Sequence, residues 1–306
     1  DNLEHPWALA WLPNGDMLIT ERPGRLRLMR QGGLVDTPLS GLPTIFAGGQ
    51  GGLLDVRLHP RFDENKKVYF TYAHGTALAN RTRVAVASLN GLALDDWRVL
   101  FEVATPKAGG QHFGSRMAWL PDGTLLVSIG DGGNPPVRLD GDWIRKKAQS
   151  KGSRLGKIVR LTADGQVPAD NPFPKSDSAD PHIWSLGHRN IQGLAYDPLR
   201  DRVWASEHGA LGGDELNQIA GGENYGWPTV TYSREYVGGV KISEHTSKTG
   251  MRDPEIVWMT AIAPSGLEIY TGDRFPQWRG DLFAGGLQSQ DIRGIDLNAG
   301  GKVMGE

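Results

Sequence analysis

The chain has 306 residues, of which 39% are hydrophobic and 22% charged, so it can bury a core and is not a disordered segment. Its 33 lysines and arginines nearly balance 35 aspartates and glutamates, which argues against a nucleic-acid partner. The absence of cysteine excludes disulfides, thiol catalysis and iron–sulfur clusters. No apolar run approaches the ~20 residues that a membrane helix needs, so we expect no membrane insertion.

One unit recurs along the chain: a short apolar strand, a turn and a second strand. In the first and third copies the turns are Pro13-Asn14-Gly15 and Pro121-Asp122-Gly123, and Asn-Gly or Asp-Gly accepts the positive φ of a tight hairpin. Further strand candidates follow each copy. Four antiparallel strands per unit indicate an all-β fold, a β-propeller, as a single domain over residues 1–306. The five copies span residues 7–20, 53–72, 117–129, 193–206 and 266–285.

The five copies leave too little chain for another complete unit. A propeller must protect the strand edges of its last blade. A closed ring of five blades is one possibility. We expect instead six four-stranded antiparallel blades, with the last one missing or divided between the ends of a shortened chain. The segment 292–297 has the pattern of a final strand. Long loops are expected over one end of the central channel at 132–154, 166–181 and 232–253, with a short helix at 142–148.

The first candidate site residue is Gln50, which lies among four glycines in the segment 46–53. This segment lacks the Lys-Ser/Thr pair and the following helix of a phosphate-binding loop. Small neighbours let a ligand approach the backbone closely. The pattern indicates that the Gln50 side chain faces a flat ligand.

His112 lies just before the third unit, and Asp131 follows the next strand. An imidazole titrates near neutral pH and can act as a general base. A hairpin returns both positions to one end of the blade, where the carboxylate could hold the imidazole in one tautomer. The alternatives are a structural histidine in a glycine-rich turn and a plain Gly-Asp-Gly turn.

Two further polar segments precede and follow the first strand of the fourth unit. Arg189 offers a planar donor fork that suits a carboxylate or a developing oxyanion, or alternatively an ion pair between blades. Glu207, Asp214 and Glu215 lie in a glycine-rich stretch and offer the oxygen ligands that Ca²⁺ prefers. A solvated acidic turn is the alternative. The tryptophan pairs 7/11 and 204/227 are interpreted as blade packing.

Taken together, these segments resemble the soluble PQQ-dependent sugar dehydrogenases, particularly the aldose sugar dehydrogenase branch. The resemblance runs in order through nearly the whole chain. It rests on residues 5–10, 49–55, 111–116, 129–131, 187–193, 206–209, 213–217, 223–228 and 262–266.

The resemblance implies a quinone over the mouth of the propeller channel. His112 would take the proton from the anomeric hydroxyl of an aldose, and a hydride would pass to PQQ, giving a lactone. Asp131 would orient His112, and Arg189 would stabilise the developing oxyanion beside a Ca²⁺ Lewis acid. An external electron acceptor would reoxidise the cofactor. The expected location is the periplasm or outside the cell, and the start at Asp1 is consistent with a removed export signal.

The resemblance also implies which residues would contact Ca²⁺ and PQQ. Ca²⁺ would be bound by the backbone carbonyls of Gly209 and Ala210, and Glu215 and Tyr225 match positions that hold another calcium. The glucose-oxidising branch has a basic cofactor contact on its fifth blade that is absent from 284–290 here, so Gln288 would take part of its role. The expected quinone contacts are Gln50, His112, Arg189, Asn190, Pro264 and Gln288.

Two other functions remain possible on the residues alone. One is a calcium-dependent propeller hydrolase that acts on lactones, against which the ordered set of Gln50, His112, Arg189 and Gly209 argues. The other is a non-enzymatic propeller that binds a glycan or a protein.

Overall fold

The computed structural model describes residues 2–173 and 178–306, which form five four-stranded antiparallel sheets. The first sheet contains β1 (Pro6–Trp11), β2 (Met17–Glu21), β3 (Arg25–Arg30) and β4 (Gly33–Leu34). The second contains β5 (Leu53–Leu58), β6 (Lys67–Gly75), β7 (Asn80–Asn90) and β8 (Ala93–Glu102), with α1 (Phe62–Asn65) between its first two strands. The third contains β9 (Met117–Trp119), β10 (Leu125–Ile129), β13 (Lys157–Leu161) and β14 (Ile183–Leu186).

The remaining two sheets follow the same order. The fourth contains β15 (Ile191–Asp197), β16 (Arg202–Glu207), β17 (Asp214–Ile219) and β18 (Ile256–Trp258). The fifth contains β19 (Pro264–Ile269), β20 (Leu282–Gly286), β21 (Asp291–Leu297) and β22 (Val303–Gly305), with the 3-10 helix η2 (Pro276–Trp278) in its first hairpin.

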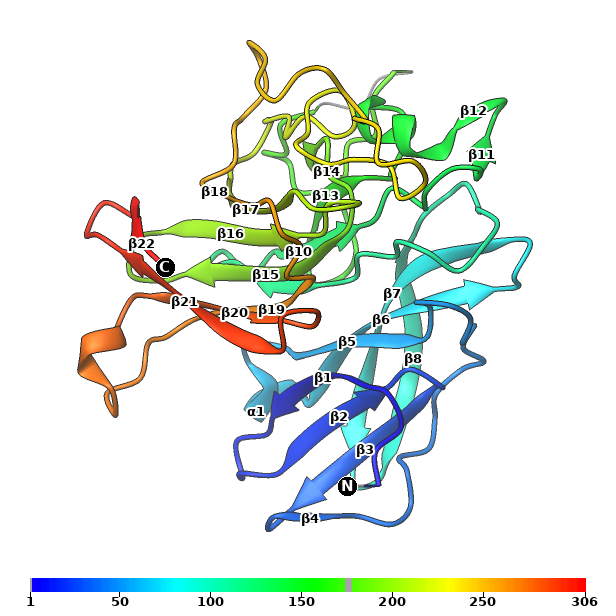
Figure 1. Cartoon of the computed structure of the whole chain (residues 1–306). Helices are drawn as coiled ribbons and strands as arrows, with labels where there is room; N and C mark the ends of the chain where they lie inside the picture. The colour runs from blue at the N-terminus through cyan, green and yellow to red at the C-terminus, as the bar shows by residue number, and fades with distance from the viewer. Residues whose placement is uncertain (1, 174–177) are drawn as a thin grey trace.

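The first strands of successive sheets lie next to one another around an axis. β1 contacts β5, β5 contacts β9, β9 contacts β15, and β15 contacts β19. The sheets radiate from these strands, as the colour sequence of Figure 1 shows. This arrangement is a β-propeller, which confirms the predicted all-β fold class.

The prediction of six blades is wrong for the described residues, which form five four-stranded sheets. The segment 292–297, which has the pattern of a final strand, belongs to β21, the third strand of the fifth sheet, and pairs with β20. That sheet is complete, with β22 as its fourth strand. The single domain over 1–306 and the shortened chain ends stay predictions.

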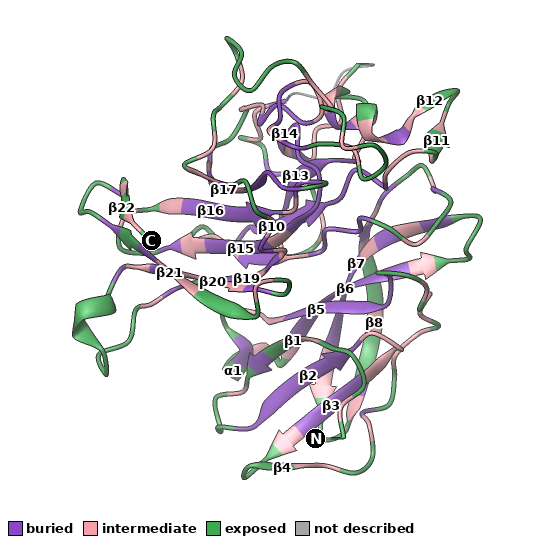
Figure 2. Ribbon diagram, viewed as in Figure 1, coloured by how far each residue is buried: buried purple, intermediate pink, exposed green. Residues whose placement is uncertain are grey.

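The core of the propeller consists of separate apolar clusters between neighbouring blades. The second strands β2 and β10 are buried along their whole length, whereas β8 and β22 are partly exposed (Figure 2). A strand that is covered on both faces carries apolar residues at consecutive positions rather than at alternate ones. The cluster between the third and fourth blades, for example, contains Leu126, Ile158 and Val203.

Buried hydroxyl groups on the second strands join each of the first three blades to the next one. Each donates to a carbonyl of the following blade's first strand or of the segment beside it. The bonds are Thr20 Oγ1 to Leu54 O at 2.6 Å, Thr71 Oγ1 to Ser115 O at 2.8 Å and Ser128 Oγ to Ile191 O at 3.4 Å. Ser206 of β16 is equally buried, but its Oγ has no hydrogen-bond partner within the described part of the chain.

The loops of the third and fourth blades are the longest. The helix expected at 142–148 is the 3-10 helix η1 (Ile144–Gln149), and it follows a two-stranded ribbon of β11 (Arg138–Leu139) and β12 (Asp142–Trp143). Within the expected loop 166–181, residues 174–177 lie outside the described residues. Among residues 2–173 and 178–306, no helix is long and apolar enough to cross a membrane.

The two buried serines give a matched stability test. Ser128 Oγ also accepts the Arg116 backbone N–H at 3.0 Å, so Ser128→Ala leaves that buried donor unpaired. We expect a loss of about 1–3 kcal/mol in the free energy of unfolding. Ser206→Ala removes a hydroxyl without a partner and is expected to cost much less. Urea denaturation of both variants measures the difference, and equal losses would contradict the assigned role of Ser128.

Candidate active site

The predicted base and its carboxylate meet at one end of the third blade. His112 lies in the segment before β9, and Asp131 follows β10. The two side chains are 3% and 0% exposed, and His112 Nδ1 donates to Asp131 Oδ1 at 2.6 Å. With its proton on Nδ1, the neutral imidazole has its lone pair on Nε2, so Nε2 is the atom that can accept a proton.

The local backbone explains this close approach. His112 has a φ of 49°, in the left-handed region that histidine enters more readily than β-branched residues do. A Cβ at Gly130 would lie 2.2 Å from His112 O, so only glycine lets the two segments touch. The backbone N–H of His112 donates to Gln50 Oε1 at 2.8 Å. Gln50 therefore belongs to the same group of side chains.

Arg189 is fixed at both its backbone and its guanidinium. Its backbone N–H donates to Glu207 Oε2 at 2.6 Å, and its Nη1 donates to His208 O at 3.0 Å. Its backbone carbonyl accepts the Asp131 N–H at 2.8 Å. Its buried Nε has no partner among the residues that the structure describes. The guanidinium therefore lies beside the dyad and keeps one donor free.

Asn134 bridges the predicted base and the predicted oxyanion donor. Its Nδ2 donates to His112 Nε2 at 3.4 Å, and its Oδ1 accepts Arg189 Nη2 at 2.9 Å. One amide group thus contacts both residues, which shows that His112 Nε2 and the Arg189 guanidinium lie within reach of the same small polar group.

The surroundings of His112 favour its neutral form. Burial lowers the pKa of His112 to about 4, and the charge of Arg189 acts in the same direction, while Asp131 opposes both. The imidazole is therefore uncharged at neutral pH and can accept a proton.

The other predicted quinone contacts lie at different distances from this group. Asn190 Oδ1 accepts the Gly114 N–H at 3.1 Å, which ties it to the segment that carries His112. Pro264 O accepts His208 Nε2 at 2.7 Å. Gln288 is exposed, and its backbone N–H donates to Ile262 O at 3.0 Å. No interaction among the described residues joins Gln288 to the His112 group.

The predicted calcium segment is held by backbone amides. The N–H of Gly209 donates to Asp214 Oδ1 at 2.8 Å, and that of Ala210 donates to Ser233 Oγ at 3.1 Å. Asp214 Oδ2 accepts the N–H groups of Ile262 and Ala263 at 2.8 Å each. The Asp214 carboxylate is therefore a structural acceptor and not a free metal ligand. In residues 2–173 and 178–306 no three His, Cys, Asp or Glu side chains are grouped to hold a metal.

Glu215 lies opposite Glu207 in the β16–β17 pair. Burial raises the pKa of Glu215 to about 8, and the neighbouring Glu207 adds to the shift. Asn217 Nδ2 is 3.3 Å from both carboxyl groups, while its buried Oδ1 lacks a partner in the described ranges. Tyr225 Oη donates to the Gln218 carbonyl at 2.8 Å, which leaves the backbone carbonyl of Tyr225 as its candidate ligand atom.

Sequence reasoning missed two residues of the site. Asn134 lay in a segment interpreted only as a loop, and Trp227 was interpreted as packing. The structure shows that Trp227 Nε1 donates to Asp131 Oδ2 at 2.7 Å. The available signal was that Trp227 belongs to the segment 223–228, which carried the resemblance although no role was assigned to it.

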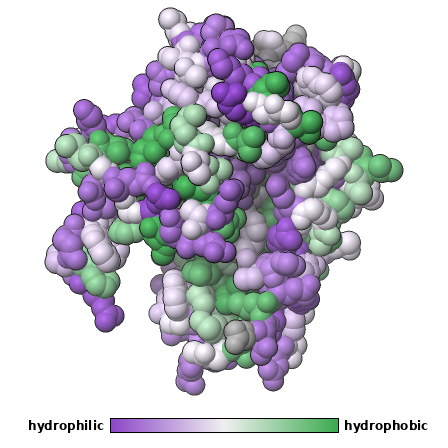
Figure 3. All heavy atoms as spheres, viewed as in Figure 1, coloured by the Kyte–Doolittle hydropathy of each residue, from purple (hydrophilic) through white to green (hydrophobic). Residues whose placement is uncertain are grey.

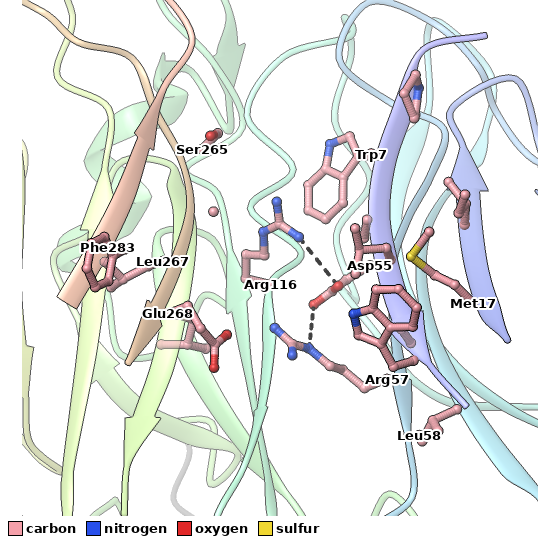
Figure 4. A pocket seen from close by; sticks show the side chains of 18 of the residues that line it. Trp7, Met17, Asp55, Arg57, Leu58, Arg116, Ser265, Leu267, Glu268 and Phe283 are labelled. Atoms are coloured by element: carbon pink, nitrogen blue, oxygen red, sulfur yellow. Dashed lines mark hydrogen bonds and ion pairs between the residues drawn. The ribbon is translucent and has the colours of Figure 1, made fainter. Parts of the chain in front are cut away.

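A separate open cavity of about 1120 Å³ lies along the first strands. Figure 4 shows Trp7, Asp55, Arg57, Arg116 and Glu268 around it. The guanidinium of Arg116 stacks on the Trp7 ring at 3.9 Å. Apolar side chains gather over β1 on the face shown in Figure 3. His112, Asp131 and Arg189 do not line this cavity, so it is distinct from the candidate site.

The chain is similar to several known sugar dehydrogenases. The aldose sugar dehydrogenase YliI of Escherichia coli (strain K12) is 40% identical over 99% of this chain and 80% of its own length. A crystal structure of a glucose dehydrogenase matches with a TM-score of 0.93 at 40% identity, covering 100% of this chain and 86% of the other. The PQQ-bound aldose sugar dehydrogenase from Streptomyces coelicolor matches with a TM-score of 0.77 at 32% identity, covering 100% and 80%.

The family model described as "Glucose / Sorbosone dehydrogenase" matches residues 3–306. Because this match spans almost every residue, the chain belongs to the glucose/sorbosone dehydrogenase family.

Proposed function

We propose that the protein oxidises the anomeric carbon of an aldose sugar to a lactone with PQQ and Ca²⁺. PQQ, when bound, supplies the acceptor for the hydride, and Ca²⁺ polarises it. The observation that carries the proposal is the buried His112–Asp131 pair beside Arg189, with one amide spanning the space between His112 Nε2 and the guanidinium.

The residues around this space suit a planar, anionic cofactor. Arg189 keeps an unpartnered buried Nε, which is a donor for an acceptor that the protein does not itself provide. Gln50 and Asn190 lie in the same hydrogen-bonded group. We include Pro264 and Gln288 as further contacts, in line with the resemblance.

In this proposal the proton moves along one short path. His112 Nε2 accepts the proton of the anomeric hydroxyl. Asp131 keeps the other ring proton on Nδ1 and stabilises the imidazolium that forms. Arg189 donates to the oxygen on which negative charge develops. All three groups are buried, so these interactions act in a medium of low dielectric, where they are stronger than in water.

Two calcium sites belong to the proposal. Gly209 and Ala210 would contribute backbone carbonyls beside the quinone, because the Asp214 carboxylate is occupied by backbone amides. Glu215 and the Tyr225 carbonyl would hold a second ion, and the orphaned Asn217 Oδ1 adds an oxygen donor there. Hard oxygen ligands suit Ca²⁺, and a bound cation would favour the ionised form of Glu215, whose pKa burial raises.

A periplasmic or secreted location and an external electron acceptor rest on the family resemblance.

Replacement of the base gives the first test of the activity. The protein is reconstituted with PQQ and Ca²⁺, and the reduction of an artificial electron acceptor is measured with a panel of aldoses. His112→Gln is expected to lower turnover by roughly 10²–10⁴-fold, because it removes a general base, while the affinity for PQQ stays within a few-fold.

His59→Gln is the matched control, because His59 belongs to a different cluster, against Tyr69 and Trp119. It should keep wild-type turnover. A His112→Gln variant that reduces the acceptor at the wild-type rate would rule out His112 as the base. Hydrolysis of a lactone without any reduction would favour the hydrolase instead.

Calcium binding is testable without PQQ. We expect Ca²⁺ to raise the melting temperature of the cofactor-free protein, because a ligand that binds only the folded state stabilises it. Glu215→Gln should abolish most of this increase. Glu268→Gln, which changes another carboxyl whose pKa burial raises, should retain it. Equal increases in the three proteins, measured by scanning calorimetry, would show that Glu215 binds no calcium.

A further inference from the structure

We propose that Trp227 is a positioning residue that fixes the Asp131 carboxylate, and through it His112, by donating its indole N–H. This inference rests on the proposed function, in which His112 is the base. It assigns a role in proton transfer to a residue that would otherwise be interpreted as packing.

The Trp227 ring is itself rigidly placed. Its side chain lies in the segment after β17 and is buried, with 5% of the residue exposed. The backbone N–H of Trp227 donates to Gly187 O at 3.0 Å, and its carbonyl accepts Gln149 Nε2 at 2.8 Å. Gly187 belongs to the segment that carries Arg189. The indole is therefore anchored to the same segment as the guanidinium.

The ring contacts both charged groups of the site. Its Nε1 donates to Asp131 Oδ2 at 2.7 Å, and the Arg189 guanidinium lies over the ring at 5.3 Å from its centroid. A cation over an indole face is attracted by the ring. A single side chain thus connects the carboxylate of the third blade with the guanidinium that precedes the fourth.

The Trp227 bond determines how Asp131 faces His112. Oδ1 accepts His112 Nδ1 and the Gly133 N–H at 3.0 Å, and the indole is the partner of Oδ2. With both oxygens bonded, the carboxylate cannot rotate without breaking a bond. The indole also draws negative charge towards Oδ2, which weakens the stabilisation of a charged imidazole by Oδ1.

Loss of the indole N–H is expected to raise the pKa of His112. In Trp227→Phe more of the negative charge of Asp131 faces His112, so the imidazolium becomes easier to form and the pKa of His112 rises. We expect a rise of about half a unit to one unit. Turnover at neutral pH should fall about tenfold, since the carboxylate can then rotate.

Trp227→Phe leaves the other charged or titratable groups around the site in place. They are Arg189 and His208 around His112, Lys107 and Lys157 near Asp131, and Arg145 over the indole.

Trp204 is a matched control in the same blade. It is also buried, with 0% exposed, but its Nε1 has no hydrogen-bond partner in the ranges that the structure describes. Trp204→Phe therefore makes the same chemical change without breaking such a bond. It should lower the stability and leave both the pKa of His112 and the turnover at their wild-type values.

The decisive measurement is made on the cofactor-free protein. The His112 ring protons are followed by NMR between pH 7 and acid, with His112→Gln identifying the resonance. A rise in the pKa in Trp227→Phe but not in Trp204→Phe supports the proposal. An unchanged pKa in Trp227→Phe overturns it. Because no PQQ is present, this result stands even if the reconstituted protein oxidises no sugar.

Two further variants keep the proposal testable if Trp227→Phe does not fold and check that the effect passes through Asp131. If Trp227→Phe does not fold, a benzothiophene analogue of tryptophan at position 227 keeps the two-ring shape and removes only the N–H, and the same shift is expected. In an Asp131→Asn background, loss of the indole N–H should produce no further shift in the pKa of His112, since the effect passes through the carboxylate. A full, additive shift in that background would overturn the proposed route.

Discussion

The desolvation of the Asp131 carboxylate is the constraint on which the site depends. A carboxylate without exposure to water must be compensated by donors, and here the donors come from distant parts of the chain: the His112 imidazole, the Gly133 backbone and the Trp227 indole. The hydrogen bonds to the Asp131 carboxylate therefore determine the positions of the segments that carry His112, Gly133 and Trp227. The position of the base follows from the need to pair a buried charge.

The propeller supplies the rigidity that such a site requires. The four largest apolar clusters each lie between two neighbouring blades, and hydroxyl groups on second strands bond to the following blade. The loops at one end are consequently carried by strands that are packed on both sides. Arg189 shows the result: its backbone N–H is bonded to Glu207 at the end of β16, and its carbonyl to the N–H of Asp131 at the end of β10.

The sequence predicted the features that depend on local chemistry. Turns such as Pro121-Asp122-Gly123 marked the hairpins, and antiparallel pairing was enough to bring His112 and Asp131 to one end. The contributions of Asn134 and Trp227 were not predictable in this way, because they arise from contacts between segments separated by many residues. Asp214 shows the same limit: its acidic, glycine-rich segment left a calcium ligand and a solvated acidic turn both open, and the structure shows that its oxygens accept backbone N–H groups.

The hairpin turns have a consequence for the use of the protein on surfaces. The site residues lie at the starts of the first strands and the ends of the second strands, so the intervening turns lie at the far end of each blade. Strands of about six residues place roughly 20 Å between the two ends. Turns such as Asn14-Gly15 and Asp122-Gly123 are exposed. They are suitable attachment points for immobilisation on an electrode, which would leave the loops around His112 open to solution.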